Sequence, residues 1–392
     1  MPNDDVILEV KDLSVHFGSL KAVDKISFSV RRGEVFGIVG ESGCGKTTTG
    51  RALIRLYEPT GGEVYLDGLR ISAGPLEYTT AIKDAKKQLR ELKNAPNAEQ
   101  NAALIEQYNA VVTENQKNLK ALNVNYDAIY KSEKSKELRA EFEGRDDKES
   151  LDELNYRLRI IKKTNPVTQM QMIFQDPIAS LDPRMTVRDI IAEGLVIGGH
   201  IKRDEVDEKV YAVLESVGLV REHALRYPHE FSGGQRQRIG IARAIIMKPK
   251  IIIADEPVSA LDVSIQAQVI TILNNLRKTL GLTVIFIAHD ISVVKYISDR
   301  IAVMYYGKIV EEADSDELFA HPFHPYTHSL FSAIPYPDPL REKKRTRTTY
   351  NPVTAHDYSV NQPSVREVSP RHFVHCNDEE FAAYTAALRA GL

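Results

Sequence analysis

Short, uninterrupted runs of apolar residues mark the central strands that this chain is expected to form. Three of these runs are Val35–Val39, Ile251–Ala254 and Thr283–Ala288. Runs of this length without polar alternation are typical of parallel strands that are buried on both faces. Each run ends in polar residues, and open α/β sheets bind their ligands at the carboxyl ends of such strands. We therefore expect a ligand site at one edge of a parallel sheet.

A different pattern, with apolar residues three or four positions apart, occupies the region from about Ile71 to Pro166. The spacing predicts amphipathic helices with breaks near Pro96 and Gly144. The apolar positions are Ile82, Ala85, Leu89, Leu92, Leu104, Tyr108, Val111, Leu151, Leu154, Leu158 and Ile161. Mixed charges favour a solvated helical hairpin over a self-repelling tail. Two roles stay open for it: a tolerated surface insertion, or a regulatory or partner-docking arm.

The segment after the first apolar run has the phosphate-binding pattern G-x-x-x-x-G-K-[ST]. A helix-compatible segment then begins at Thr48. Glycines allow successive backbone N–H groups to point at phosphate oxygens, and the helix N-terminus adds partial positive charge. Lys46 can reach the β- and γ-phosphates, and the Thr47 hydroxyl can ligate Mg²⁺. The pattern therefore predicts a nucleoside triphosphate site, and its residues are Gly40, Glu41, Ser42, Gly43, Cys44, Gly45, Lys46 and Thr47.

The other two apolar runs end in groups that triphosphate hydrolysis requires. Asp255 and Glu256 follow one of them. We expect Asp255 in the Mg²⁺ shell, and Glu256 can polarise the attacking water as a general base. His289 follows the other run, within reach of the γ-phosphate. A lone histidine at a strand end is more often structural, but beside two phosphate motifs it is a catalytic candidate.

Further motifs make the chain resemble the ABC-type ATPases. Phe231–Arg238 reads Phe-Ser-Gly-Gly-Gln-Arg-Gln-Arg and is similar to the signature sequence of that family. The motifs also follow the family's order, which is phosphate loop, Gln175, signature, Asp255–Glu256, Ser259–Asp262 and His289. The resemblance covers residues 6 to about 320. It implies an α/β fold with a RecA-like parallel-sheet core, an antiparallel N-terminal β subdomain and a helical signature subdomain.

The same resemblance implies roles for single residues. Gln175 would contact Mg²⁺ and water, Glu256 would be the catalytic carboxylate, and His289 would hold the γ-phosphate in line. Phe17 lies where an aromatic ring stacks on adenine in the family, although it can equally be a core residue. The signature would meet the ATP held by a partner subunit, so that two ATPs lie between two chains; the residues concerned are Ser232, Gly233, Gly234, Gln235 and Asp262.

Two longer segments narrow the resemblance to the ATPases of oligopeptide and dipeptide permeases. They are Gln175–Val187 and His321–Leu330. The resemblance implies an importer with two nonidentical ATPases, of which this chain is similar to the second. Two transmembrane subunits and an extracytoplasmic substrate-binding protein would complete it. Nickel and oligosaccharides stay open as cargo. A soluble ABC ATPase acting on ribosomes or DNA, and a nucleotide-controlled regulator, are the alternative functions.

Composition adds the expected cellular setting. A formal net charge of −3 over 392 residues gives no global attraction to nucleic acid or anionic lipid, so we expect no nucleic-acid partner. No apolar run approaches the ~18–20 residues of a membrane span. We expect a peripheral protein at the cytoplasmic face of the membrane.

The two cysteines, Cys44 and Cys376, cannot form a disulfide framework or a four-thiolate iron–sulfur cluster, so we expect no such cluster in this chain. Cys44 lies near a helix N-terminus, which lowers thiol pKa. We expect that the Cys44 thiol can be alkylated and that bound ATP prevents this alkylation, unless the thiol is buried and inert.

Four regions summarise the expected organisation. Residues 6–70 hold the first part of the core with the phosphate loop, and 71–166 form the insert. Residues 167–320 hold the rest of the core with the helical subdomain, and 321–392 form the permease-type extension. Within the extension, short strands are expected in Val365–Cys376, and 364–392 is a candidate regulatory or dimer-contact domain. For His321–Leu330, a metal site on His321, His324 and His328 is a weaker alternative to the interpretation that rests on the family resemblance.

Overall fold

Strand β3 (Val35–Val39), the first predicted run, lies inside an eight-stranded sheet of order β11-β12-β10-β9-β3-β8-β7-β6. Every residue of β3, β7 and β8 is buried, as the uninterrupted apolar pattern predicts. The strands from β9 to β6 in this order run parallel, and β10, β12 and β11 add antiparallel pairs. Their bounds are β6 Met170–Ile173, β7 Ile251–Asp255, β8 Thr283–Ala288, β9 Arg300–Tyr305, β10 Lys308–Asp314, β11 Ser364–Ser369 and β12 His372–Cys376.

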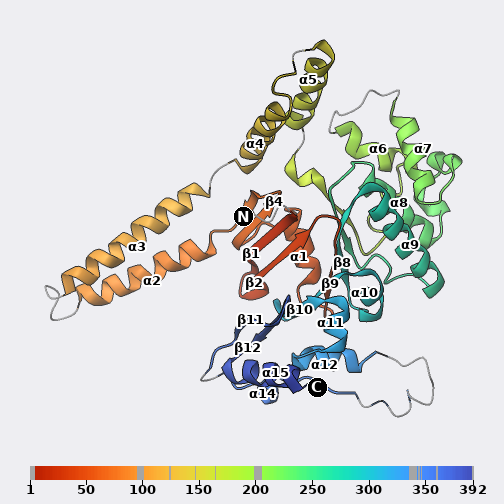
Figure 1. The fold of residues 1–392 in the computed structure, drawn as a ribbon. Coiled ribbons are helices and arrows are strands. Elements are labelled where there is room, and N and C mark those ends of the chain that lie inside the picture. Colours follow the sequence, from red (N-terminus) through yellow and green to blue (C-terminus); the bar gives the residue numbers. More distant parts are fainter. Residues whose placement is uncertain are drawn as a thin grey trace.

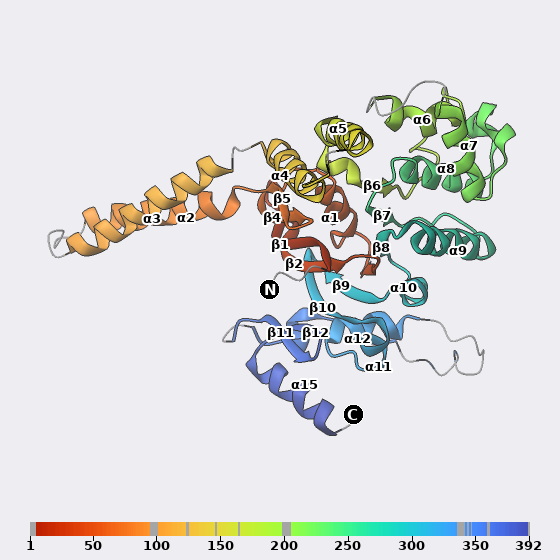
Figure 2. The same cartoon turned by 45° about the horizontal axis from the view of Figure 1, so that its top comes forward.

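This computed structural model describes residues 5–94, 101–122, 125–145, 147–163, 165–197, 205–334, 342, 345, 347–358 and 361–390. Within that part of the chain, no helix combines the length and the apolar character that crossing a membrane requires. Figures 1 and 2 show a central body with one long helical arm that projects from it.

A four-stranded antiparallel sheet of order β2-β1-β4-β5 covers one side of the body. Its strands are β1 Val6–Phe17, β2 Leu20–Arg31, β4 Gly61–Leu66 and β5 Leu69–Ala73. A shared core that includes Val10, Val23, Ile38 and Leu53 joins this sheet to the main sheet and to α1 (Lys46–Leu53). The antiparallel subdomain expected from the sequence is therefore present.

Asp67 ties the β4–β5 turn to the main sheet. Its carboxylate accepts hydrogen bonds from Arg32 Nη2 at 2.6 Å and from Lys250 Nζ at 2.5 Å, and its side chain is 3% exposed. Burial acts to raise the pKa of Asp67, but Lys250 and Arg32 outweigh this effect and hold the pKa below its ordinary value.

Helices cover the other side of the main sheet and form the helical subdomain (Figure 2). They bury a large apolar core that reaches from Ile191 through Ile239 to Phe286. The helices are α6 Val187–Ile197, α7 Val206–Ser216, α8 Gly233–Ile245, α9 Val263–Leu280 and α10 Ile291–Ile297, with 3₁₀ turns η4 Arg221–Leu225 and η5 Pro228–Glu230.

The region predicted as one helical hairpin forms two. Helices α2 (Leu76–Lys93) and α3 (Ala102–Ala121) pair as the projecting arm (Figure 1), whereas α4 (Tyr126–Glu141) and α5 (Lys148–Lys163) form a second pair, of which α4 packs against β5. Gly144, with a φ of 81°, forms the expected break between α4 and α5, and Pro96 lies outside the described residues. Strand β5 ends at Ala73, so the first helix begins a few residues after the boundary expected at Ile71.

Helix α4 is the part of the insert that is anchored to the core. Tyr130 is 3% exposed, and its hydroxyl accepts a 2.6 Å hydrogen bond from Gln169 Nε2 in η2 (Pro166–Gln169). Arg55 Nη1, just after α1, donates to Asp127 Oδ1 at 2.8 Å. Helix α3, in contrast, buries none of its residues.

The C-terminal extension continues the main sheet. The strands expected in Val365–Cys376 form β11 and β12, and β12 pairs with β10. Phe323, Val374 and Cys376 form a small core beneath this edge. The tail therefore adds two strands to the edge of the main sheet. Helix α11 (Ser315–Ala320) precedes the tail, and the tail contains α12 Pro325–Ser332, α14 Pro352–Ala355 and α15 Asp378–Ala390.

Candidate nucleotide-binding and catalytic site

The predicted phosphate loop connects β3 to α1 and depends on close backbone packing. Gly40 has a φ of 154°, and a Cβ there would lie 2.1 Å from the carbonyl oxygen of Met304. Gly45 caps α1 with a φ of 107°, and its Cβ would lie 2.2 Å from the oxygen of Ala22. Only glycine fits these two positions without moving backbone atoms.

Lys46 points into the loop itself. Its side-chain Nζ donates to the carbonyl oxygens of Gly40 at 2.7 Å and Glu41 at 2.8 Å, and the residue is only 4% exposed. A buried ammonium surrounded by loop backbone is a ready partner for a phosphate group. The loop amides of Gly43 to Gly45 and the first turn of α1, which contains Thr48, surround the same space.

Two of the three predicted Mg²⁺ ligands, Thr47 and Asp255, lie in direct contact, whereas the third, Gln175, bonds to Glu256. Thr47 Oγ1 donates to Asp255 Oδ1 at 2.9 Å. Burial raises the pKa of the Asp255 carboxyl, and the hydrogen bond from Thr47 offsets only part of that rise. A hydroxyl and a buried carboxylate fit Mg²⁺, which takes few protein ligands and completes its shell with phosphates and water. In the described ranges no three His, Cys, Asp or Glu side chains form a metal cage of their own.

The three predicted catalytic side chains lie together, because Gln175 and His289 both contact one carboxylate oxygen of Glu256. Glu256 Oε2 accepts a hydrogen bond from Gln175 Nε2 at 3.0 Å and lies 3.0 Å from His289 Nδ1. These residues follow β6, β7 and β8, whose parallel carboxyl ends meet at one edge. Glu256 is 9% exposed, whereas the His289 side chain is 54% exposed and faces solvent. The group can polarise a water molecule delivered beside His289.

Glu256 also has a backbone conformation that is uncommon for a residue with a side chain. Its φ is 45°, in the left-handed region, and its N–H donates to the oxygen of Ile287 at 2.8 Å. Such strained residues concentrate at functional sites, where the surrounding structure holds them in place. The sequence contained no signal for this feature.

The signature residues lie on the helical subdomain and bond to one another. Ser232 Oγ accepts from the Gln235 N–H at 3.4 Å, and Gln235 Oε1 accepts from the Ser232 N–H at 3.0 Å, which is a capping box for α8. A Cβ at Gly234 would lie 2.5 Å from the Ile265 side chain, and Gly233 packs near Leu261. Ser232, Gly233 and Asp262 are exposed, so this surface is free to meet another molecule.

Phe17, the predicted adenine-stacking residue, is 47% exposed and therefore is not a core residue. Its ring meets Tyr57 edge-on, with the ring centroids 5.3 Å apart. An exposed ring face of this kind is suited to stacking.

The expectation of a lowered pKa at Cys44 is wrong. The residue is 6% exposed, and burial raises the pKa of its thiol, which nearby Lys46 only partly opposes. The helix N-terminus is thus a weaker influence than desolvation at this position. Cys44 is therefore a buried thiol, which was the alternative expectation.

Two of the three histidines of the weaker metal hypothesis, His321 and His324, have separate partners. His321 Nδ1 lies 3.3 Å from Glu317 Oε2, whereas His324 Nδ1 accepts the Tyr326 N–H at 3.1 Å and caps α12. Burial lowers the pKa of His324 to about 3.

Sequence reasoning also missed a contact of the phosphate loop, between Glu41 and Tyr326. In the sequence, His321–Leu330 indicates a family resemblance and a weaker metal hypothesis, and neither predicts this contact.

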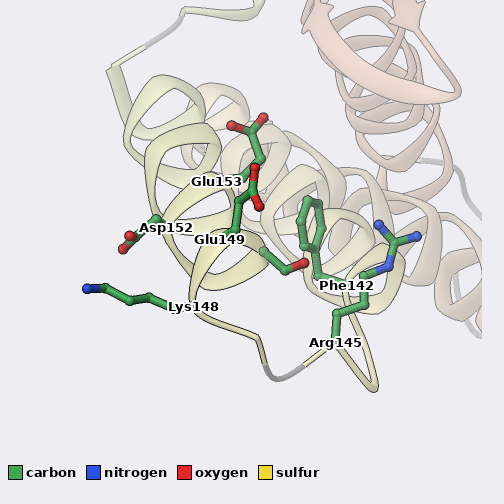
Figure 3. A pocket seen from close by; sticks show the side chains of 7 residues that line it. Phe142, Arg145, Lys148, Glu149, Asp152 and Glu153 are labelled. Atoms are coloured by element: carbon green, nitrogen blue, oxygen red, sulfur yellow. The ribbon is translucent and has the colours of Figure 1, made fainter.

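Two hollows lie near these elements. One, of about 600 Å³, opens beside β6, α6 and α8 and is lined by Phe174, Ile190 and Arg243 among others. The other, of about 900 Å³, lies at the α4–α5 turn, where Figure 3 shows the Phe142 ring with Arg145 on one side and the carboxylates of Glu149 and Glu153 on the other. None of the residues lining the second hollow is a predicted site residue.

Known proteins share both the sequence and the fold. The model of the ABC transporter family matches residues 23–141 and 128–259, and that of the oligopeptide/dipeptide transporter C-terminal region matches 310–359. The oligopeptide transport ATP-binding protein OppF of Bacillus subtilis is 46% identical over 97% of this chain and 99% of that protein. The dipeptide transport ATP-binding protein DppF of Lactococcus lactis is 41% identical over 96% of both chains.

Solved structures share the fold at low sequence identity. The ATP-binding cassette MJ1267 in its ADP conformation gives a TM-score of 0.53 at 20% identity, over 84% of this chain and 99% of that one. The dimeric cassette MJ0796 bound to ADP and Pi gives 0.50 at 22% identity, over 79% and 99%. The expected ABC ATPase fold is confirmed.

Proposed function

Because the chain belongs to the ABC transporter family, we propose that it is an ATP-hydrolysing subunit that powers import of oligopeptides or dipeptides across the cytoplasmic membrane. The observation that carries the hydrolytic part is the convergence of Gln175 and His289 on Glu256, next to the Thr47–Asp255 pair. The match of residues 310–359 to the oligopeptide/dipeptide transporter C-terminal region, and the relatives named for such transport, support peptides over nickel or oligosaccharides as cargo.

The residues of the site have separate roles in ATP hydrolysis. Lys46 and the loop amides bind and orient the triphosphate, and Phe17 stacks on adenine. Thr47, Asp255 and Gln175 would hold Mg²⁺, which when bound would neutralise charge that develops on the phosphates. Glu256 takes the proton of the attacking water, while Gln175 and His289 fix the position of its carboxylate through the two 3.0 Å contacts.

The proposed assembly contains a second, nonidentical ATPase, two transmembrane subunits and, indirectly, an extracytoplasmic substrate-binding protein. The exposed signature surface around Ser232 supports a partner whose ATP it contacts. The hollow lined by Phe174 and Ile190 is a candidate docking groove for a cytosolic helix of a transmembrane subunit. Its closeness to Gln175 would link the state of the nucleotide to the membrane. In this proposed assembly the chain is a peripheral protein at the cytoplasmic face of the membrane.

Substitution of Glu256 by Gln tests the hydrolytic role. The amide keeps the shape of the side chain but cannot take a proton, so ATP turnover by the complete complex is expected to fall about 10²- to 10⁴-fold. ATP affinity of the purified chain should stay close to that of the wild type. Glu58→Gln, at an exposed carboxylate, is the control and should keep full turnover. Turnover of Glu256→Gln near the wild-type rate would refute the assignment.

Recovery of the tagged chain from native membranes in mild detergent tests the transport role. We expect two multi-span proteins and a second, nonidentical ATPase to co-purify and to be identified by mass spectrometry. A chain found only in the soluble fraction, or bound to ribosomes or DNA, would overturn the importer. In that case a soluble ABC ATPase would be the better description. ATP-dependent peptide uptake by the reconstituted complex then distinguishes peptides from other cargo.

A further inference from the structure

The phosphate loop makes one contact with the C-terminal extension that the proposed mechanism does not use. The backbone N–H of Glu41 donates a 3.0 Å hydrogen bond to the hydroxyl oxygen of Tyr326, which lies 285 positions later in the chain. Tyr326 belongs to the first turn of α12 and is 1% exposed. Solvent therefore cannot readily replace this hydroxyl as the partner of the loop amide.

The ring of Tyr326 is fixed by its neighbours. It packs against Tyr305 of β9 with the centroids 4.4 Å apart, and against Tyr350 at 5.6 Å. Its own backbone N–H donates to His324 Nδ1 at 3.1 Å. Two aromatic contacts and a helix cap therefore hold the hydroxyl in one place relative to the main sheet.

A buried carboxylate connects this arrangement to the tail. Glu311 of β10 is fully buried, and its oxygens accept from the N–H groups of Phe323 at 2.7 Å and His324 at 3.1 Å. The same carboxylate lies 2.9 Å from His372 Nε2 of β12, which is also fully buried. The chain of contacts thus runs from β12 through Glu311 to the start of α12, and through Tyr326 to Glu41.

We infer that Tyr326 is a positioning residue for the phosphate loop, and that the C-terminal extension thereby sets the affinity of this chain for ATP. The hydroxyl fixes the backbone at Glu41, so the loop amides keep their arrangement before the nucleotide arrives. Fixing a site in its bound arrangement reduces the ordering cost of binding. The inference rests on the proposed nucleotide site, because it concerns the affinity of that site.

Tyr326→Phe removes the hydroxyl and keeps the ring, so the aromatic packing survives. Loss of one hydrogen bond to the loop is expected to weaken ATP binding about 3- to 10-fold. The KM for ATP of the assembled complex should rise by a similar factor, while kcat at saturating ATP stays within about 2-fold of the wild type. A purely structural role would lower the melting temperature of the nucleotide-free chain without this split between KM and kcat.

Tyr350→Phe is the matched control, because it removes a hydroxyl from the same ring cluster without touching Glu41. Its ATP affinity should equal that of the wild type. Equal ATP affinity of Tyr326→Phe and wild type, or an equal loss in both variants, would overturn the inference. A wild-type chain that does not bind ATP at all would instead refute the nucleotide site itself, so the two failures are distinguishable.

The tail can be tested separately with His372→Gln, which alters the partner of Glu311 away from the loop. We expect its ATP affinity to fall in the same direction as that of Tyr326→Phe, and the double variant to lose less than the product of the two single effects. Such non-additivity is the mark of residues acting through one contact path. Full additivity, or no effect of His372→Gln on ATP affinity, would remove the tail from the proposal.

Discussion

Both cysteines are shielded from solvent, and this sets their reactivity. Cys44 is 6% exposed and Cys376 is fully buried, and burial raises the pKa of both thiols, that of Cys376 to about 11. We expect iodoacetamide to label the native chain at neutral pH at least about ten-fold more slowly than the urea-unfolded chain, because thiolate is the reactive form. Intact-mass spectrometry over time measures this. Rapid single labelling of the native chain would contradict it.

At the scale of residues, the sequence located the catalytic groups but not their supports. Glu256 and His289 each follow an apolar run, and parallel strands bring their carboxyl ends together, so a shared edge could be predicted. Gln175 was identified only through the family resemblance. Tyr326 could not be placed beside Glu41, because a side-chain contact across 285 positions leaves no periodic pattern. The raised pKa at Cys44 likewise depends on burial, which the loop motif alone does not reveal.

At the scale of elements, Asp67 holds the β4–β5 hairpin against the main sheet. Its φ of 51° suits asparagine as well as aspartate, so Asp67→Asn removes the charge and leaves the turn intact. We expect the free energy of unfolding at pH 7 to fall by about 1–2 kcal/mol, measured by urea titration. Glu9→Gln, at the exposed pair with Lys11, is the control and should change it by less than about 0.5 kcal/mol.

The pH dependence of this difference follows from the direction of the pKa shift. Because the pKa of Asp67 is below its ordinary value in the folded chain, its stabilisation is complete above the unfolded pKa of about 3.9. It is lost as the pH falls through the folded value. The gap between wild type and Asp67→Asn should therefore be constant from pH 7 to 5 and shrink below about pH 4. A gap that widens on acidification would disprove the role of the charge.

Periodicity predicted the helices of the insert but not how they pair. Apolar positions such as Ala85 and Leu89 are buried in α2, as expected, yet α3 buries none of its residues. Amphipathic spacing shows which face of a helix is apolar and says nothing about which neighbour covers it. The division into a projecting arm and a docked pair depends on single contacts such as that between Tyr130 and Gln169.

At the scale of the whole molecule, the signature surface is predicted to serve a second subunit. Ser232→Ala should leave the ATP affinity of the isolated chain within about 2-fold of the wild type, because Ser232 is exposed and bonds within its own helix cap. ATP turnover by the assembled complex should fall at least about ten-fold, since a donor that stabilises transferring phosphate is lost.

Asn125→Ala, which removes the side-chain cap of α4, is the control for the loss of a helix cap alone. That variant should keep full turnover. An equal loss of turnover in both variants would show that Ser232 acts only on helix stability.

The position of β3 between β8 and β9 has a consequence for biogenesis. The phosphate loop is translated early. The strands on either side of β3 begin only at Thr283 and Arg300, and Tyr326, which contacts the loop at Glu41, is translated 285 residues after Glu41. At synthesis rates of about 5–20 residues per second, the loop waits roughly 15–60 s for these partners. Chains terminated before Thr283 thus lack both strands that flank β3, so ATP retention by newly made protein reports synthesis past these strands.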